Sequence, residues 1–147
     1  MKTIVASFLL CAFVLVSAMD NQFIMHEICT DYDEGMEIFS IDFDNDGDFD
    51  LLTAGSDCIL WLNDGSGNFS GTTIYSNPSW ARSIRAADLD NDDDNDIVLA
   101  ALASNLVVII ENTETGFIQT ELDNSLVMPH TIDLKDLDGD GDIDILC

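Results

Sequence analysis

An all-β fold is predicted for this chain of 147 residues, and three observations predict it. After residue 18, apolar residues gather in short, β-branched runs, and no stretch keeps the period of an amphipathic helix. Clusters of turn-forming residues, such as residues 63–68, separate these runs. A segment with aspartate at every second position occurs three times at nearly constant spacing. We therefore expect a repeat protein built from antiparallel strands.

The first 18 residues have the features of a secretory signal peptide. Lys2 provides the positive charge, residues 4–16 form a short apolar stretch, and residues 16–18 end it with small side chains. The apolar stretch is shorter than the roughly 20 residues of a membrane-spanning helix, although an uncleaved anchor is the alternative. We expect residues 1–18 to be removed, and the protein to be secreted to the extracellular space, or to the periplasm in a bacterium.

Each repeat is predicted to contain four short strands. One strand enters an aspartate-rich loop, a second leaves it, a third follows, and a hairpin turn leads to the fourth. The expected strands are residues 36–41, 49–54, 59–62 and 69–75 in one repeat, and residues 82–87, 97–101, 106–110 and 117–122 in the next.

The repeat extends beyond the aspartates. Phe23, Phe69 and Phe117 each stand 19 residues before the first aspartate of a loop. The three loops begin at positions 42, 88 and 136, so successive repeats are spaced by 46 and 48 residues. The predicted units are residues 23–68, 69–116 and, in part, 117–147.

Four antiparallel strands per unit is the composition of a β-propeller blade. Residues 19–147 provide about 2.5–3 blades, whereas closed propellers typically have about 4–8. Residues 19–147 are therefore expected to form an incomplete β-propeller of four-stranded antiparallel meanders, and the chain to be the N-terminal part of a longer protein or a truncated gene product. A short chain that closes its propeller by self-association is the alternative.

The aspartate-rich segments form three acidic loops: residues 42–50 (first), 88–96 (second) and 136–144 (third). Carboxylates at alternate positions repel one another unless a cation neutralises them, and a ligand set made only of oxygen atoms favours Ca²⁺. In a tight hairpin loop, the side chains at positions 1, 3, 5 and 9 and the backbone carbonyl at position 7 can converge on one ion. The expected ligands are Asp42, Asp44, Asp46, Asp48, Asp50, Asp88, Asp90, Asp92, Asp94, Asp96, Asp136, Asp138, Asp140, Asp142 and Asp144.

Up to three Ca²⁺ sites are expected, and the second is expected to be the weakest. Gly47 and Gly141 occupy the sixth loop position, where a sharp turn needs a positive φ, whereas the second loop has Asp93 there. An EF-hand is the rival interpretation, but its twelfth position needs a bidentate Glu. The corresponding residues here are Thr53, Leu99 and Cys147, and the flanking segments are strand-like.

The charge of the chain limits its partners. The formal net charge is −25, and the only basic residues are Lys2, Arg82, Arg85 and Lys135. Nucleic acids and anionic membranes attract proteins with basic patches, so neither is expected as a partner, and no membrane insertion is expected after signal cleavage.

Three cysteines, Cys29, Cys58 and Cys147, remain after removal of the signal peptide. An odd number in a secreted chain leaves at least one thiol outside an internal disulfide. A disulfide between Cys29 and Cys58 and a pair of buried, reduced thiols are both compatible with the sequence.

The order of an Ile-containing strand, a DxDxDGDxD loop, an apolar pair and an NDGxGxF turn resembles FG-GAP/VCBS repeats. The segments that carry the resemblance are residues 40–52, 63–69, 86–99 and 135–146. The resemblance implies blades like those of the integrin α-subunit propeller, with Ca²⁺ bound in the first hairpin loop of each blade. The second unit departs from the pattern at Asp93 and in residues 113–115, which lack the glycine-rich turn.

The resemblance implies a secreted, non-catalytic binding or adhesion module whose ligand is an extracellular protein or carbohydrate. No nucleophile, phosphate-binding loop or Cys/His site is evident, so an enzyme is not expected, and neither is a catalytic or organic cofactor site. The alternative is the propeller portion of a secreted carbohydrate-active enzyme whose catalytic residues lie outside this chain.

Overall fold

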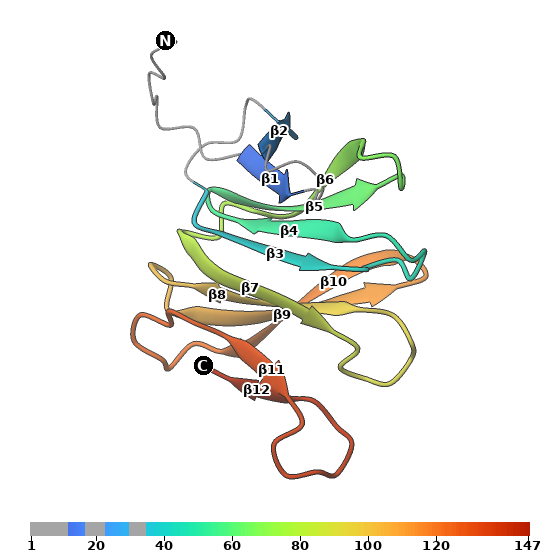
Figure 1. Ribbon diagram of the computed structural model, residues 1–147. Helices are drawn as coiled ribbons and strands as arrows, with labels where there is room; N and C mark the ends of the chain where they lie inside the picture. Colours follow the sequence, from blue (N-terminus) through green and yellow to red (C-terminus); the bar gives the residue numbers. More distant parts are fainter. Residues whose placement is uncertain (1–11, 17–22, 30–34) are drawn as a thin grey trace.

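The computed structural model describes residues 12–16, 23–29 and 35–147, and every regular element in these ranges is a β-strand (Figure 1). The predicted all-β class is confirmed. The strands that follow the N-terminal pair agree with the expected segments to within a few residues. All the strands of the described residues are β1 (Ala12–Val16), β2 (Phe23–Glu27), β3 (Glu37–Ile41), β4 (Asp50–Ala54), β5 (Asp57–Asn63), β6 (Phe69–Ser76), β7 (Ala81–Ala87), β8 (Asp96–Ala101), β9 (Leu106–Thr113), β10 (Gly116–Asp123), β11 (Asp133–Lys135) and β12 (Asp144–Leu146).

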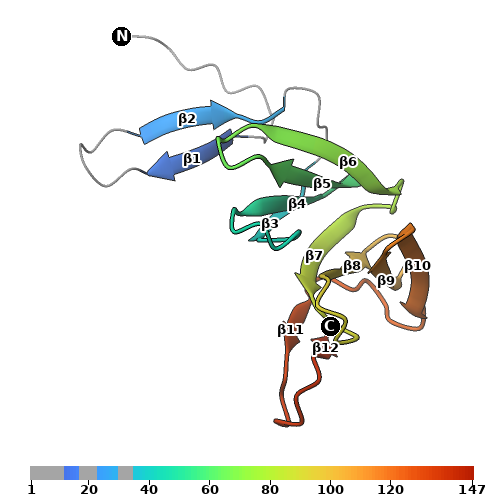
Figure 2. The same ribbon diagram turned by 90° about the vertical axis from the view of Figure 1, so that its right-hand side faces the viewer.

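Two four-stranded antiparallel meanders dominate the structure. Strands β3-β4-β5-β6 form the first sheet and β7-β8-β9-β10 the second, while β11 and β12 form a third sheet of two strands. Strand β7 contacts β3 on one side and β11 on the other, so the three sheets follow one another as successive blades of a partial propeller (Figure 2). The absence of helices in the described residues excludes the EF-hand interpretation.

The sheets are offset from the units read from the sequence. The first sheet spans residues 37–76 and the second residues 81–123, whereas the sequence units begin at residues 69 and 117. Phe69 and Phe117, which start the second and third sequence units, lie in the fourth strands β6 and β10, and each of these pairs back on the third strand of its own sheet. The sheets therefore coincide with the predicted sets of four strands, whereas the unit bounds drawn at the phenylalanines fall inside the sheets.

Strand β8 shows why these blades need neighbours. All six of its residues are buried. Ile97 and Leu99 belong to the apolar cluster shared with the first sheet, whereas Val98 and Ala100 belong to the cluster shared with Ile132 of the third unit. Successive side chains of a strand point to opposite faces, so a strand covered on both faces has a continuous apolar sequence.

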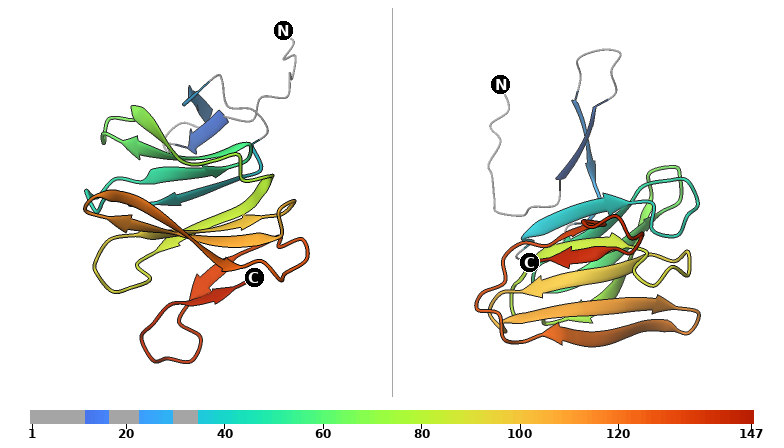
Figure 3. Two further views of the ribbon diagram at one scale, coloured as in Figure 1. Left: turned by 180° about the vertical axis from the view of Figure 1, so that it is seen from behind. Right: turned by 90° about the horizontal axis from the view of Figure 1, so that it is seen from below.

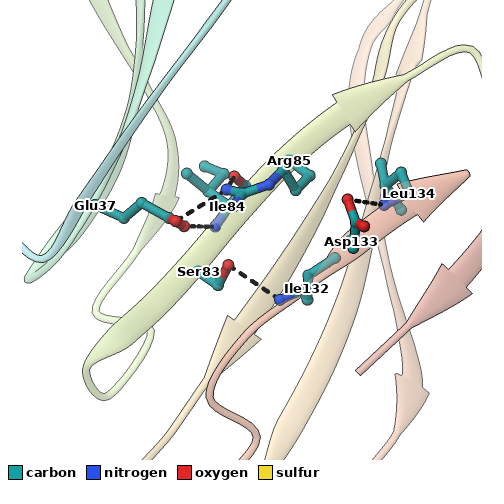
Figure 4. Close-up of polar contacts among 7 residues, drawn as sticks. All are labelled: Glu37, Ser83, Ile84, Arg85, Ile132, Asp133 and Leu134. Carbon is teal, nitrogen blue, oxygen red and sulfur yellow. Dashed lines mark hydrogen bonds and ion pairs between the residues drawn. The ribbon is translucent and has the colours of Figure 1, made fainter.

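Polar contacts join the first strands of successive sheets (Figure 4). The Glu37 carboxylate accepts a hydrogen bond from the Ile84 backbone N–H at 2.8 Å and forms an ion pair with Arg85 at 3.0 Å. The Ser83 hydroxyl accepts from the Ile132 backbone N–H at 3.1 Å. Glu37 and Ser83 occupy the same repeat position, five residues before an acidic loop, so one type of contact is used at both junctions.

The N-terminal strands β1 and β2 form a separate antiparallel pair. Strand β1 lies within residues 1–18, the expected signal peptide, and the rest of that segment lies outside the described residues. Its removal therefore stays a prediction. Within the described part of the chain, no helix has the length and apolar character needed to cross a membrane.

Cys58 lies in β5 as a buried, reduced thiol, so the structure contains no disulfide between it and Cys29. Burial raises the pKa of the Cys58 thiol to about 12. Of the two alternatives that the sequence left open, the buried apolar role describes Cys58.

We expect Ser83→Ala to lower the free energy of unfolding by about 1–3 kcal/mol, because the buried Ile132 N–H loses its acceptor. Urea denaturation of the full chain measures the change. Ser70→Ala, at an exposed position of β6, is the control and should have little effect. Equal stabilities of the Ser83 and Ser70 variants would show that this contact contributes nothing.

Cys58 should resist alkylation at pH 8 in the folded protein, because the thiolate is the reactive form and its population at that pH is very small. Iodoacetamide labelling followed by peptide mass spectrometry measures the reaction. Exposed Cys147 should be modified first, and Cys58 only after guanidinium is added. Rapid labelling of Cys58 without denaturant would contradict the buried position.

Candidate metal centres

Each acidic loop connects the two strands of an antiparallel pair, β3–β4, β7–β8 or β11–β12, and the three loops share two internal hydrogen bonds. The backbone N–H at position 6 donates to the carboxylate at position 1. The distances are 3.0 Å for Gly47 to Asp42, 3.1 Å for Asp93 to Asp88 and 3.2 Å for Gly141 to Asp136. The N–H at position 7 donates to the carboxylate at position 5 at 2.9, 2.9 and 3.0 Å. The first aspartate therefore closes each loop.

Two positions of each loop have left-handed backbone conformations. At position 6, Gly47, Asp93 and Gly141 have φ values of 97°, 73° and 101°, which agrees with the sharp turn expected there. Position 4 was not anticipated. Asn45, Asn91 and Gly139 have φ values of 59°, 63° and 81° at that position. The signal was present in the sequence, since Asn and Gly are the residues that adopt this conformation at the lowest cost.

The carboxylates converge in three clusters, one in each loop, within which the potential ligand atoms lie no more than 4.8 Å apart. The first and third clusters use positions 1, 3 and 9 of the loop, and the second uses positions 1, 3 and 5. The clusters are Asp42, Asp44 and Asp50; Asp88, Asp90 and Asp92; and Asp136, Asp138 and Asp144. The second loop therefore differs from the other two in which aspartates it brings together.

The other expected ligands lie outside these clusters. In the first and third loops, the carboxylate at position 5 accepts a hydrogen bond from the backbone N–H at position 7. The residue at position 7 is the one whose backbone carbonyl was expected to bind the ion. These remaining residues are Asp46, Asp48, Asp94, Asp96, Asp140 and Asp142.

The aspartate at position 9 has a second role that the sequence did not reveal. Asp50 is fully buried, and its two carboxylate oxygens accept the N–H groups of Phe43 and Asn63, both at 2.8 Å. Asp96 accepts in the same way from Leu89 at 3.2 Å and from Asn112 at 2.9 Å. These bonds connect the start of the first and second loops to the third strands of their sheets, β5 and β9. The buried carboxylate therefore fixes the loop on the blade.

The electrostatics of the loops disfavour a full set of negative charges. Burial, followed by the nearby carboxylates of Asp46 and Asp50, raises the pKa of Asp44. Burial and Asp92 raise the pKa of Asp90, and burial raises that of Asp96. A cation in each loop would offset this repulsion and favour the ionised carboxylates.

One atom gives a direct test of whether a cation fits. Asp42 Oδ1 is buried and has no hydrogen-bond partner among the residues that the structure describes. A buried carboxylate oxygen without a donor is costly, and a metal ion is a natural partner for it beside other carboxylates. The first loop can therefore hold a metal ion, and the clusters of the other two loops share its chemistry.

The three loops lie at the same end of successive sheets, and asparagine side chains link them (Figure 3, left). Asn45 donates to the carbonyl of Asp93 at 3.0 Å, and Asn95 donates to the carbonyl of Asp42 at the same distance. Asn91 links the second loop to the third, since its side-chain amide donates to the Asp142 carboxylate at 3.3 Å. Neighbouring loops therefore constrain one another.

Comparison with known proteins agrees with this geometry. A protein-family model described as FG-GAP-like repeat matches residues 42–99, which extend from the first acidic loop into β8. Searches of the curated proteins and of the solved structures find no significant match. The matched segment contains one complete acidic loop, most of a four-stranded sheet and the whole of the next acidic loop. Residues 42–99 of this chain are therefore similar to an FG-GAP-like repeat.

Proposed function

We propose that this chain is a calcium-binding, non-catalytic binding or adhesion module of the extracellular space, and that Ca²⁺ stabilises the hairpin loops of its blades. The observation that carries the proposal is the buried Asp42 Oδ1, which lies without a hydrogen-bond donor in a cluster of carboxylates. The all-β blades and the FG-GAP-like repeat support the comparison with propeller modules.

The ligand chemistry favours Ca²⁺ over other cations. Each cluster offers only carboxylate oxygen, whereas Zn²⁺ sites normally include Cys or His. Mg²⁺ needs near-octahedral geometry and retains several waters, while Ca²⁺ accepts larger and less regular sets of oxygen ligands. Carboxylates and a backbone carbonyl from one nine-residue loop are a set of that kind.

The ions are proposed to be structural. In each loop, the carboxylates at positions 1 and 9 stabilise the hairpin by accepting backbone N–H groups. In the first loop these residues are Asp42 and Asp50. Bound calcium would supply the positive charge that lets these carboxylates remain ionised together. A site exposed to calcium at about 100 times its dissociation constant would add roughly 2.7 kcal/mol to stability. Extracellular calcium suits such sites, which supports a secreted protein.

We propose a non-catalytic module because the aspartates of the acidic loops are already engaged in other contacts. The clustered carboxylates are expected to be occupied as ion ligands, and those at position 9 also accept backbone N–H groups. Such groups are poorly placed for general acid–base catalysis, which needs a carboxyl free to exchange a proton with a substrate. The proposed ligand is an extracellular protein or carbohydrate.

Asp42→Asn and Asp136→Asn should each remove one calcium ion per chain, because each change removes the charge of the first ligand of one loop and replaces one of its two oxygens by an amide NH₂ group. Asp88→Asn should remove the weakest of the three binding steps. Isothermal titration calorimetry of the full chain measures the stoichiometry. Glu121→Gln removes an equal charge from exposed β10 and serves as the control. An unchanged stoichiometry in all the Asp variants would refute the ligand assignment.

Calcium should raise the melting temperature by several degrees at pH 7 and by less near pH 4, since 1 kcal/mol corresponds to about 4–8 °C. Because the pKa values of Asp44, Asp90 and Asp96 are raised by folding, their protonation stabilises the calcium-free fold at low pH. This stabilisation by protonation is lost as the pH rises through the raised pKa values. Calcium and protons compete for the same carboxylates, so calcium binds less well at low pH.

Thermal melts of calcium-depleted and calcium-loaded samples at the two pH values measure this difference. A calcium effect that is absent at pH 7, or that does not decrease on acidification, would show that the acidic loops are not structural ion sites.

A further inference from the structure

A cavity of about 320 Å³ lies between the first and second sheets, next to the first two acidic loops. Its volume is at the lower end of the range for small-molecule sites, about 300–1,000 Å³. One part of the lining is apolar and the other part carries oxygen atoms. The lining residues are Phe43, Leu60, Leu62 and Phe117, together with Asp44, Thr72, Asp94 and Asn112.

The apolar side of this inter-sheet cavity is well anchored. Phe43 is only 4% exposed, and its backbone N–H is held by the buried Asp50 carboxylate. The Phe43 and Phe117 rings are 6.3 Å apart and inclined at 52°, so they are not stacked face to face. Rings in this arrangement, with Leu60 beside them, can contact the hydrocarbon part of a ligand, and ring faces attract a cation.

The charge around the cavity selects a cation. The first acidic loop contains five aspartates and the second contains six. One divalent ion in each loop would leave net charges of −3 and −4 (2 − 5 and 2 − 6). None of the lining residues is basic. A field of one sign beside a hydrophobic cavity concentrates ligands of the opposite sign.

Asp94 is the carboxylate best placed to receive such a ligand. It occupies position 7 of the second loop, where the backbone carbonyl, and not the side chain, is the expected ion ligand. Asp94 is exposed, is one of the residues that line the cavity, and belongs to none of the three candidate metal-ligating clusters. Asp44, by contrast, belongs to the cluster of the first loop.

We propose that the inter-sheet cavity binds an organic ammonium ion with an apolar body. The ammonium donates hydrogen bonds to the Asp94 carboxylate and the neighbouring oxygen atoms, and its hydrocarbon part packs against Phe43, Phe117 and Leu60. A free amine and the lysine side chain of a polypeptide share this chemistry. The inference rests on the proposed role of the chain as a binding module and gives that role a ligand class, but it does not require the ions themselves to contact the ligand.

The test is a titration of the calcium-saturated full chain with benzylammonium at pH 7 and low ionic strength, followed by NMR chemical shifts. Benzyl alcohol, which has the same shape and no charge, is the matched ligand. Loss of the charge-assisted hydrogen bond should weaken binding about tenfold, both for benzyl alcohol and for benzylammonium with Asp94→Asn. Asp48→Asn removes the same charge at the same position of the first loop, but does not line the cavity, and should have a much smaller effect.

A second variant tests the place of binding without removing a charge. Thr72→Phe puts a large side chain into the cavity from exposed β6 and should abolish binding. Equal binding of benzyl alcohol, equal weakening by the Asp48 and Asp94 variants, or full binding to the Thr72 variant would each overturn the proposal.

A last comparison identifies the source of the ammonium group. Tighter binding of Nα-acetyl-lysine methylamide than of benzylammonium would support a lysine side chain, and the reverse order a free amine. Calcium stoichiometry, measured on the same samples, keeps the two proposals apart. Normal calcium binding with no ammonium binding would overturn this inference alone.

Discussion

Repulsion among the carboxylates of the acidic loops is the constraint on which the rest of the structure depends. Each loop contains five or six aspartates within nine residues, and each connects the two strands of an antiparallel pair. Backbone N–H groups reduce the repulsion at positions 1, 5 and 9, and the left-handed residues at positions 4 and 6 make these contacts sterically accessible. Asp42 Oδ1 still has no hydrogen-bond donor. The protein groups therefore neutralise the loop only in part, and this is the physical basis for the proposed cations.

The same loops connect the local and the long-range organisation. The buried carboxylates of Asp50 and Asp96 each tie a loop to the third strand of its own sheet. Asn45 and Asn95 then tie the first and second loops to each other, while Glu37 provides a contact between the two sheets at the level of their first strands. A change in one loop is thus expected to affect the neighbouring blade as well as its own. This coupling suits a repeat protein, in which stability depends on the interfaces between adjacent units.

Much of the fold and of the candidate site could be predicted because the residues concerned act locally. The strands β3 to β10 follow from apolar runs and turn residues, and the requirement for a positive φ at Gly47 and Asp93 follows from the geometry of a nine-residue loop. The role of Asp50 as an acceptor for Phe43 and Asn63 could not be predicted in this way. It depends on the pairing of β4 with β5, which brings a residue 13 positions away next to the carboxylate.

The sequence by itself determined the strand content, the period of the repeat and the positions of the clustered carboxylates, since each is set by residues close together in the chain. Tertiary structure alone decided which face of β8 meets which neighbour, and that Cys58 is a buried thiol. It also decided that Phe43 and Phe117, from different sheets, border one cavity with Asp94. The physical reason is that these features arise when sheets pack against each other, and burial between sheets depends on neighbours far away in the sequence.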